Sequence, residues 1–349
     1  MSGGIAQLVA VGAQDAHLVG QPEISFFRST YKRHTNFSQT VERQVIQGNV
    51  SNGGMSTIRF ERKGDLLSYV YLVPNNGSST QGYTDAQWRT KIDKVELLVG
   101  GQVIDDQDST YSTLVAPILS ATSFSKSVAG DLFGGSTSSR FYPLRFAFCE
   151  NLQTALPLIA LQYHDVELRI TWGSTAATDK WDVYTNYVYL DTQEREYFAS
   201  KPQSMIITQV QKATASGAKI QELNFNHPVK YLAAGKASAL EILNDDNKLK
   251  LQINGIDVAD YKFADPNFSH VPLYYHTTNA SKPATVKTLF VYPFCLDASK
   301  LQPTGTLNFS RLDTARIVND TRNCDDDIYA VNYNILRIEN GMGGLLYSN

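Results

Sequence analysis

The side chains that most often carry catalysis or metal binding are scattered through this sequence rather than grouped. Its histidines show neither His-X-His nor His-Glu-X-X-His spacing, the arrangements that bring two imidazoles to one metal ion. They are His17, His34, His164, His227, His270 and His276. An isolated histidine more often has a structural role, so we predict no metal site of the cupin or metalloprotease kind.

Two acidic clusters offer the oxygen ligands that calcium prefers. They are Asp105, Asp106 and Asp108 in the first cluster and Asp325, Asp326 and Asp327 in the second. Neither cluster has the spacing of an EF-hand loop. We therefore expect both clusters to lie in solvated loops and to hold no metal.

Motifs for nucleophiles and nucleotides are missing. The sequence has neither Gly-X-Ser-X-Gly nor Gly-X-X-X-X-Gly-Lys-Ser/Thr, and the glycines of residues 341–344 follow no strand-to-helix unit. The three cysteines, Cys149, Cys295 and Cys324, are odd in number and include no Cys-X-X-Cys pair, so neither a disulfide framework nor a zinc site is encoded. We predict no catalytic residues and no cofactor, and a reducing compartment.

Asparagines followed by X-Ser/Thr provide the remaining candidate sites. They include Asn36, Asn76, Asn267, Asn279, Asn308 and Asn319. Asn76 and Asn279 lie in polar turn segments where a sugar would stay in water, so these two are our candidates for glycan attachment. Asn308 has apolar neighbours that predict strand pairing and packing, which a glycan would disrupt.

Overall charge and the first residues exclude two further classes. With 31 basic and 34 acidic residues the net charge is −3, and no basic stripe is present to neutralise phosphates, so we expect no direct contact with nucleic acid. The apolar run in residues 5–11 has no preceding Lys or Arg and is far shorter than the roughly 20 residues of a spanning helix. No secretory signal is visible.

Short runs of period-two alternation, bounded by Gly, Asn, Asp and Pro, predict a mostly β protein. Two hairpins stand out, residues 94–104 with Gly100-Gly101 at the turn and residues 248–258 with Asn254-Gly255. Both pairs suit the positive φ angles of tight hairpin turns.

The two hairpins lie about 150 residues apart, and each is followed by a Tyr-Pro strand, in residues 141–148 and 290–295. Further β-rich stretches follow at 163–172 and 306–317. This pattern predicts a duplicated all-β domain, although two unrelated β domains could share such features. The alternation breaks at residues 194–202 and resumes at Met205, and the Ser- and Gly-rich residues 120–140 are expected to form an exposed loop.

Several segments resemble the major capsid proteins of nucleocytoplasmic large DNA viruses, especially those of algal viruses. The N-terminal segments are Gly-Gly-Ile-Ala-Gln-Leu-Val-Ala at 3–10, Gly-Ala-Gln-Asp at 12–15 and Phe-Phe-Arg-Ser-Thr-Tyr at 26–31. Later segments are residues 155–164, 223–230, 302–311, 333–338 and 341–349. The resemblance therefore runs from residue 3 to the end of the chain.

This resemblance implies an all-β double jelly roll, with two tandem eight-stranded sandwiches. It implies residues 1–24 as an N-terminal arm, 25–203 as the first jelly roll and 204–349 as the second. The family also implies a structural, non-enzymatic protein of the virion, assembled in the host cytoplasm. Its implied partners are two further copies in a pseudo-hexagonal homotrimer, neighbouring capsomers and minor capsid proteins, in an icosahedral shell close to an internal membrane.

The sequence also departs from the family. Only residues 233–248 join the Asn-Phe-Asn-His-Pro strand to the second hairpin, where relatives often carry an insertion, and Ile256 follows Asn254-Gly255 where the family commonly has arginine. Two other classes stay open. A jelly-roll lectin would need exposed aromatic side chains, for which Trp88, Trp172 and Trp181 are candidates, and a sandwich hydrolase would need paired carboxylates.

Overall fold

The computed structural model describes residues 3–18, 27–119, 139–278 and 287–348, and the chain divides into two compact units, 1–36 and 37–349. The shorter unit contains the helices α1 (Gly3–Val9) and α2 (Asp15–Leu18). None of its described side chains is buried, and Leu8, Phe27 and Tyr31 are almost fully exposed. The segment therefore has no hydrophobic core of its own within its described residues.

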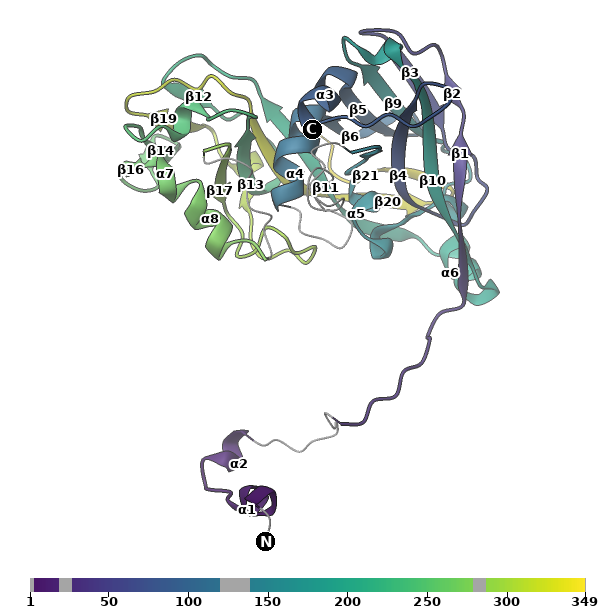
Figure 1. The fold of residues 1–349 in the computed structure, drawn as a ribbon, viewed down its shortest axis with the longest axis horizontal. Coiled ribbons are helices and arrows are strands. Elements are labelled where there is room, and N and C mark those ends of the chain that lie inside the picture. Colours follow the sequence, from purple (N-terminus) through teal and green to yellow (C-terminus); the bar gives the residue numbers. More distant parts are fainter. Residues whose placement is uncertain (1–2, 19–26, 120–138, 279–286, 349) are drawn as a thin grey trace. The chain divides into compact units, whose positions relative to one another are not determined.

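The longer unit begins with a sandwich of two antiparallel sheets (Figure 1). One sheet has the order β1 (Phe37–Gln44), β10 (Lys180–Leu190), β4 (Leu66–Asn75), β7 (Tyr142–Pro143). The other has the order β3 (Met55–Arg59), β9 (Val166–Trp172), β5 (Ile92–Val99), β6 (Gln102–Asp108). Short strands β2 (Ile46–Gln47) and β8 (Leu156–Pro157) extend the sheets. Successive principal strands thus alternate between the sheets, except at the β5–β6 hairpin, as in a jelly roll.

A second sandwich repeats this arrangement. Its first sheet has the order β11 (Gln203–Ala213), β20 (Ile328–Glu339), β13 (Pro228–Gly235), β17 (Leu289–Pro293). Its second has the order β12 (Ile220–Glu222), β19 (Ala315–Asn319), β14 (Lys248–Ile253), β15 (Ile256–Asp257). The added short strands are β16 (Lys262–Phe263), β18 (Leu307–Asn308) and β21 (Met342–Leu345). Each of the eight principal strands has a counterpart in the first sandwich.

The register of the strands confirms the expected duplication. In the first sandwich Tyr71 lies opposite Pro143, and in the second Tyr231 lies opposite Pro293, so the two Tyr-Pro strands are equivalent. The predicted hairpins are also equivalent, β5–β6 and β14–β15. Both turn residues have positive φ in each hairpin, 58° and 81° in Gly100-Gly101 and 49° and 79° in Asn254-Gly255, as the sequence predicted.

The expected strand over residues 141–148 is mostly wrong. Only Tyr142 and Pro143 pair, and α5 (Ala147–Glu150) follows almost at once. Pro143 has no N–H to continue the ladder, and the apolar side chains that suggested a strand are buried from other structure, Phe146 from the residue before α5 and Phe148 from α5 itself.

Helices fill the connections between strands. They are α3 (Asp85–Lys91), the π-helix η1 (Tyr111–Val115), α4 (Ala116–Leu119), α6 (Thr192–Ser200), α7 (Ala264–Asn267) and α8 (His270–Tyr275). Helix α6 occupies the segment where the alternation of the sequence breaks. Of the expected loop at 120–140, residues 120–138 lie outside the described part of the chain.

Alternating burial builds the core of each sandwich. On β9 the side chains Val166, Leu168 and Ile170 are buried and those between them are half-buried, as predicted. The first core also includes Ile207 on β11 and Leu336 on β20, strands whose sheet belongs to the second sandwich. The two sandwiches are therefore packed together through shared strands.

Candidate functional site

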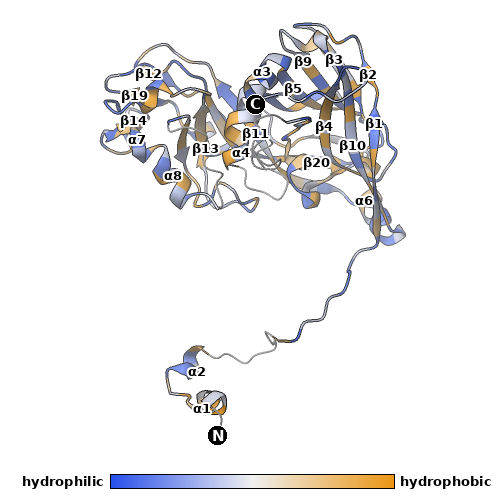
Figure 2. Cartoon of the chain, viewed as in Figure 1, coloured by the Kyte–Doolittle hydropathy of each residue, from blue (hydrophilic) through white to orange (hydrophobic). Residues whose placement is uncertain are grey.

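The junction between the sandwiches is a third hydrophobic cluster, formed by the helical connection η1–α4 on the outer face of the β11-β20-β13-β17 sheet. In Figure 1 α4 lies between the two lobes, and Figure 2 shows it as hydrophobic. The helical side contributes Tyr111, Val115, Ala116 and Leu119, and the sheet contributes Val210, Tyr231, Ala233, Leu289, Val291, Tyr329 and Val331. All are buried, so this contact resembles a domain core.

Polar contacts complete the junction. The Asp105 carboxylate on β6 accepts a hydrogen bond from the backbone N–H of Val210 on β11, at 2.9 Å. Burial raises the pKa of Asp105 to about 8. Asp108 accepts a hydrogen bond from the Tyr329 hydroxyl at 2.6 Å and pairs with Lys212 at 3.1 Å. The first acidic cluster therefore joins the sandwiches.

The expectation that this cluster lies in a solvated loop is wrong. Asp105, Asp106 and Asp108 lie on β6, where Asp105 is buried and Asp106 pairs with Lys94 at 2.8 Å. Asp105 and Asp108 contact β11 of the second sandwich, whereas Asp106 pairs with β5 of its own sheet. The second cluster lies outside the strands, with Asp326 paired to Lys236 at 2.9 Å and Asp327 to Lys212 at 2.7 Å.

A second contact between the sandwiches involves the C-terminal glycines, which the sequence search had set aside. The β20–β21 hairpin packs against the segment that contains Tyr163 and His164, and Nδ1 of His164 lies 2.9 Å from the Gly343 carbonyl oxygen. A Cβ on Gly341 would overlap the Tyr163 ring, and one on Gly343 would overlap Leu161. The C-terminal glycines thus allow the β20–β21 hairpin to dock closely on this segment. The sequence alone does not indicate this role, because it depends on which residues lie opposite the glycines.

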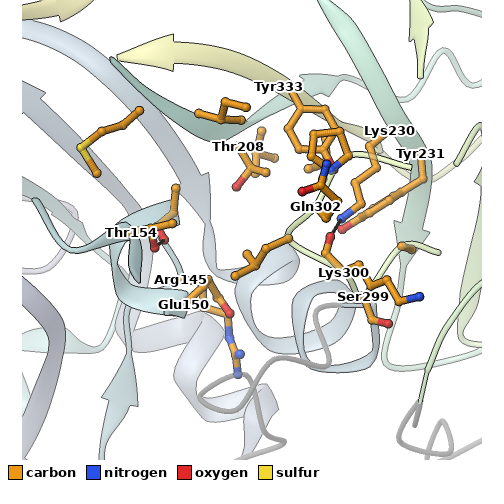
Figure 3. Close-up of a pocket in the computed structure, with 18 of the residues that line it drawn as sticks. Arg145, Glu150, Thr154, Thr208, Lys230, Tyr231, Ser299, Lys300, Gln302 and Tyr333 are labelled. Carbon is orange, nitrogen blue, oxygen red and sulfur yellow. Dashed lines mark hydrogen bonds between the residues drawn. The ribbon is translucent and has the colours of Figure 1, made fainter. Parts of the chain in front are cut away.

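A cavity of about 560 Å³ lies at the junction (Figure 3). The buried Lys230 donates a hydrogen bond to the carbonyl oxygen of Lys300 at 3.0 Å and lies about 6 Å from the ring centres of Tyr231 and Tyr333. Burial lowers the pKa of this ammonium group. Across the cavity are Arg145, Glu150 and Thr154.

These lining groups do not match the two alternative functions. Glu150 is the single carboxylate among the lining residues, whereas glycoside hydrolysis uses a pair. The three tryptophans that a lectin could have used are buried in the first core, where the ring centre of Trp181 lies 6.2 Å from that of Trp88 and 4.9 Å from that of Trp172. They are therefore unavailable for stacking on a sugar.

The asparagines considered for glycan attachment differ in their local structure. Asn76 is exposed in a turn, where its side-chain oxygen accepts hydrogen bonds from the N–H groups of Ser78 and Ser79 at 3.0 Å and 2.9 Å. Asn279 lies outside the described residues. Asn308 does pair, in β18, but the expected packing of its side chain is wrong because that side chain is exposed and the neighbouring Phe309 fills the core instead.

The described segments also bear on metal binding and on membrane spanning. There, no three His, Cys, Asp or Glu side chains are grouped so that they could hold a metal ion. Cys149, Cys295 and Cys324 are each buried and free. No helix among the described residues has the length and apolar character needed to cross a membrane.

Comparison with known proteins accounts for this geometry. Family models described as "Major capsid protein N-terminus" and "Large eukaryotic DNA virus major capsid protein" match residues 25–191 and 244–344. The major capsid protein of Pyramimonas orientalis virus is 36% identical over 402 aligned positions that cover 100% of both chains. The chain belongs to the major capsid proteins of large eukaryotic DNA viruses. The family member of Paramecium bursaria Chlorella virus 1 is 33% identical, again over 100% of both chains.

Solved structures of capsid proteins show the same fold. The chain matches the quasi-atomic model of the PBCV-1 virus capsid with a TM-score of 0.73 and 27% identity, over 93% of this chain and 100% of that one. The Faustovirus major capsid protein matches with a TM-score of 0.66 at 12% identity, over 94% of both chains, which supports the fold alone. The expected double jelly roll is confirmed, and the chain is a structural protein of the virion.

Proposed function

We propose that three copies of this chain form a pseudo-hexagonal capsomer that tiles the icosahedral shell of a large double-stranded DNA virus. The observation that carries the proposal is the duplication of all eight principal strands in one chain. Three copies around an axis present six similar sandwiches, and such a tile fills a plane where an ordinary trimer would leave gaps.

Exposed apolar side chains support a role in assembly. An obligate oligomer needs a large apolar interface, and single chains rarely expose many large apolar groups together. The longer unit exposes such groups on both sandwiches, including Val45, Ile256, Phe263, Tyr274 and Tyr275. Copies of the same chain and neighbouring capsomers are the partners we propose for them.

The remaining partners follow the family. We propose that residues 1–24 serve as an arm that contacts neighbouring subunits or minor capsid proteins, close to an internal membrane, in particles assembled in the host cytoplasm. Residues 25–203 and 204–349 are then the two jelly rolls in chain order. A net charge of −3 supports a shell that makes no direct contact with nucleic acid. We assign no enzymatic activity.

Any sugar is proposed to be attached at Asn76 and Asn279, where the turn chemistry of the sequence keeps a bulky polar group in water. Peptide mapping of protein from virions tests this assignment. We expect modified peptides to contain these two positions. Modification of Asn308 with Asn76 and Asn279 bare would contradict it.

The capsomer itself is tested by light scattering of the purified full-length chain. We expect a mass about three times the 38.7 kDa of one chain, stable on dilution because the interface is obligate. A single-chain mass at micromolar concentration would overturn the proposed capsomer.

A further inference from the structure

We infer that helix α8 of one copy packs on an aromatic face of the first sandwich of the next copy, which repeats between chains the junction that η1–α4 makes within a chain. This inference rests on the proposed trimer and names its contact. It follows from three equivalences between the sandwiches: the receiving sheets, the helical connections, and the side chains at the rim.

The receiving sheets are equivalent residue by residue. Tyr71 on β4 and Tyr231 on β13 each lie opposite the proline of a Tyr-Pro strand. Their partners on the neighbouring central strands are Tyr184 and Val331. Phe141 precedes its Tyr-Pro pair as Val291 precedes the other. These three positions on the covered face of the second sandwich therefore each have a defined counterpart on the first.

The counterparts differ in burial. Tyr231, Val291 and Val331 are at most 4% exposed because η1–α4 covers them. Tyr71, Phe141 and Tyr184 are only half-buried, although they form a continuous aromatic surface, with ring centres of Tyr71 5.9 Å from Phe141 and 5.5 Å from Tyr184. Among the described residues this aromatic face has no counterpart of η1–α4 above it.

The helical connections are also equivalent. The η1–α4 segment follows the β5–β6 hairpin and precedes β7, and α8 follows the β14–β16 strands and precedes β17. Both helical segments therefore lie between the hairpin and the Tyr-Pro strand of their sandwich. Yet most side chains of η1–α4 are buried, whereas Tyr274 and Tyr275 of α8 are 79% and 72% exposed. A helix with two neighbouring exposed tyrosines is a suitable partner for an open aromatic face.

The rim provides the third equivalence. Within the chain, Asp108 on β6 pairs with Lys212 on β11 at 3.1 Å. Asp108 lies opposite Lys94 on β5, as Phe263 lies opposite Lys248 on β14, so Phe263 is the counterpart of Asp108.

Lys212 on β11 lies opposite Tyr329 on β20. The corresponding position in the first sandwich is Val45, one residue beyond Gln44, which is the last residue of β1 that pairs with β10. Val45 and Phe263 are 71% and 50% exposed. The positions of the ion pair inside the chain thus correspond to two exposed apolar side chains. These two can pack against one another between chains, as the opposite charges pair within a chain.

One chain cannot close this second contact by itself. In Figure 1, β1 and β10 lie on the side of the first sandwich away from the second, while α8 and β16 lie on the opposite lobe. The face and the helix can therefore meet only between copies. Because the contact is head-to-tail, it closes into a ring when the rotation between copies is 120°, as a trimer requires.

Cysteine cross-linking tests the contact in the full-length protein. The variant with both Val45→Cys and Phe263→Cys should be linked into dimers and trimers by a short bis-maleimide, since the equivalent Lys212 and Asp108 meet within the chain through a long side chain that a direct disulfide would not span. Each single variant alone should stay uncross-linked, because the contact pairs position 45 with position 263. The three native cysteines are buried and should not interfere. A trimeric double variant that forms no interchain cross-link would overturn the inference.

A charge placed on α8 supplies a second test. Tyr274→Glu should convert the trimer to monomers by light scattering without loss of folding, since this side chain is exposed within the chain. Met55→Glu, a matched change at an exposed apolar residue of β3, should remain trimeric. Trimers of Tyr274→Glu would remove α8 from the interface while the proposed capsomer stands; a monomeric wild type would instead contradict the capsomer.

Discussion

The hairpins of the two jelly rolls have equivalent backbone pairing but differ in side-chain chemistry. Strand β6 of the first carries Asp105 and Asp108 into a buried contact with the second sandwich. Strands β15 and β16 of the second carry Ile256 and Phe263, both exposed. Duplication supplied two similar scaffolds, and the difference shows that one hairpin is specialised for a contact inside the chain while the other is left for a partner.

The largest effect should come from truncating the internal junction. Leu119→Ala removes a fully buried side chain from the cluster between the sandwiches. We expect it to lower the free energy of unfolding by about 2–5 kcal/mol, measured by chemical denaturation. The control Leu152→Ala, at an exposed leucine, should change it by less than about 1 kcal/mol. Equal effects would show that the junction is not a core.

The next effect should be a change in pH dependence at the same junction. Burial raises the pKa of Asp105 to about 8, so the folded chain holds this proton more tightly than the unfolded chain. Its contribution to stability is complete below about pH 4 and is lost as the pH rises through about 8.

The variant Asp105→Asn cannot ionise at this position. Between about pH 5 and pH 9 the wild type should lose on the order of a few kcal/mol relative to this variant, seen in the urea midpoint. Parallel pH profiles of the two proteins would contradict the assignment of this carboxylate.

The smallest effects should separate the two hairpin turns. Gly255 has a positive φ and open space around it, so Gly255→Ala should cost about 1 kcal/mol. At Gly100 an added Cβ would also overlap the His164 ring, beside the docked C-terminal hairpin, so Gly100→Ala should cost about 2–4 kcal/mol. Equal losses in thermal denaturation would mean that His164 moves aside freely.

Local patterns in the sequence predicted much of the fold. Alternation identified β9, and the Gly-Gly and Asn-Gly pairs identified both hairpins, because turn chemistry and side-chain period act over a few residues. The segment at 141–148 was mispredicted because its apolar spacing suits a strand, while a proline ends the pairing.

The contacts of the junction could not be predicted in the same way. The Asp105 carboxylate meets a backbone group more than 100 residues away on β11, and the C-terminal glycines matter only because Tyr163 and Leu161 lie against them. Such pairs depend on how the sandwiches pack, which no local pattern encodes. The exposed aromatic face on β4 and β10 likewise emerged only from its comparison with the covered sheet.

A three-dimensional reconstruction of the purified capsomer tests most directly the claim that one junction is used twice. The account predicts three copies in a ring, with α8 of each on the Tyr71 and Tyr184 face of the next. The contact between chains should superpose on the junction within a chain. A trimer in which that aromatic face points to solvent, or packs against a different element, would contradict it.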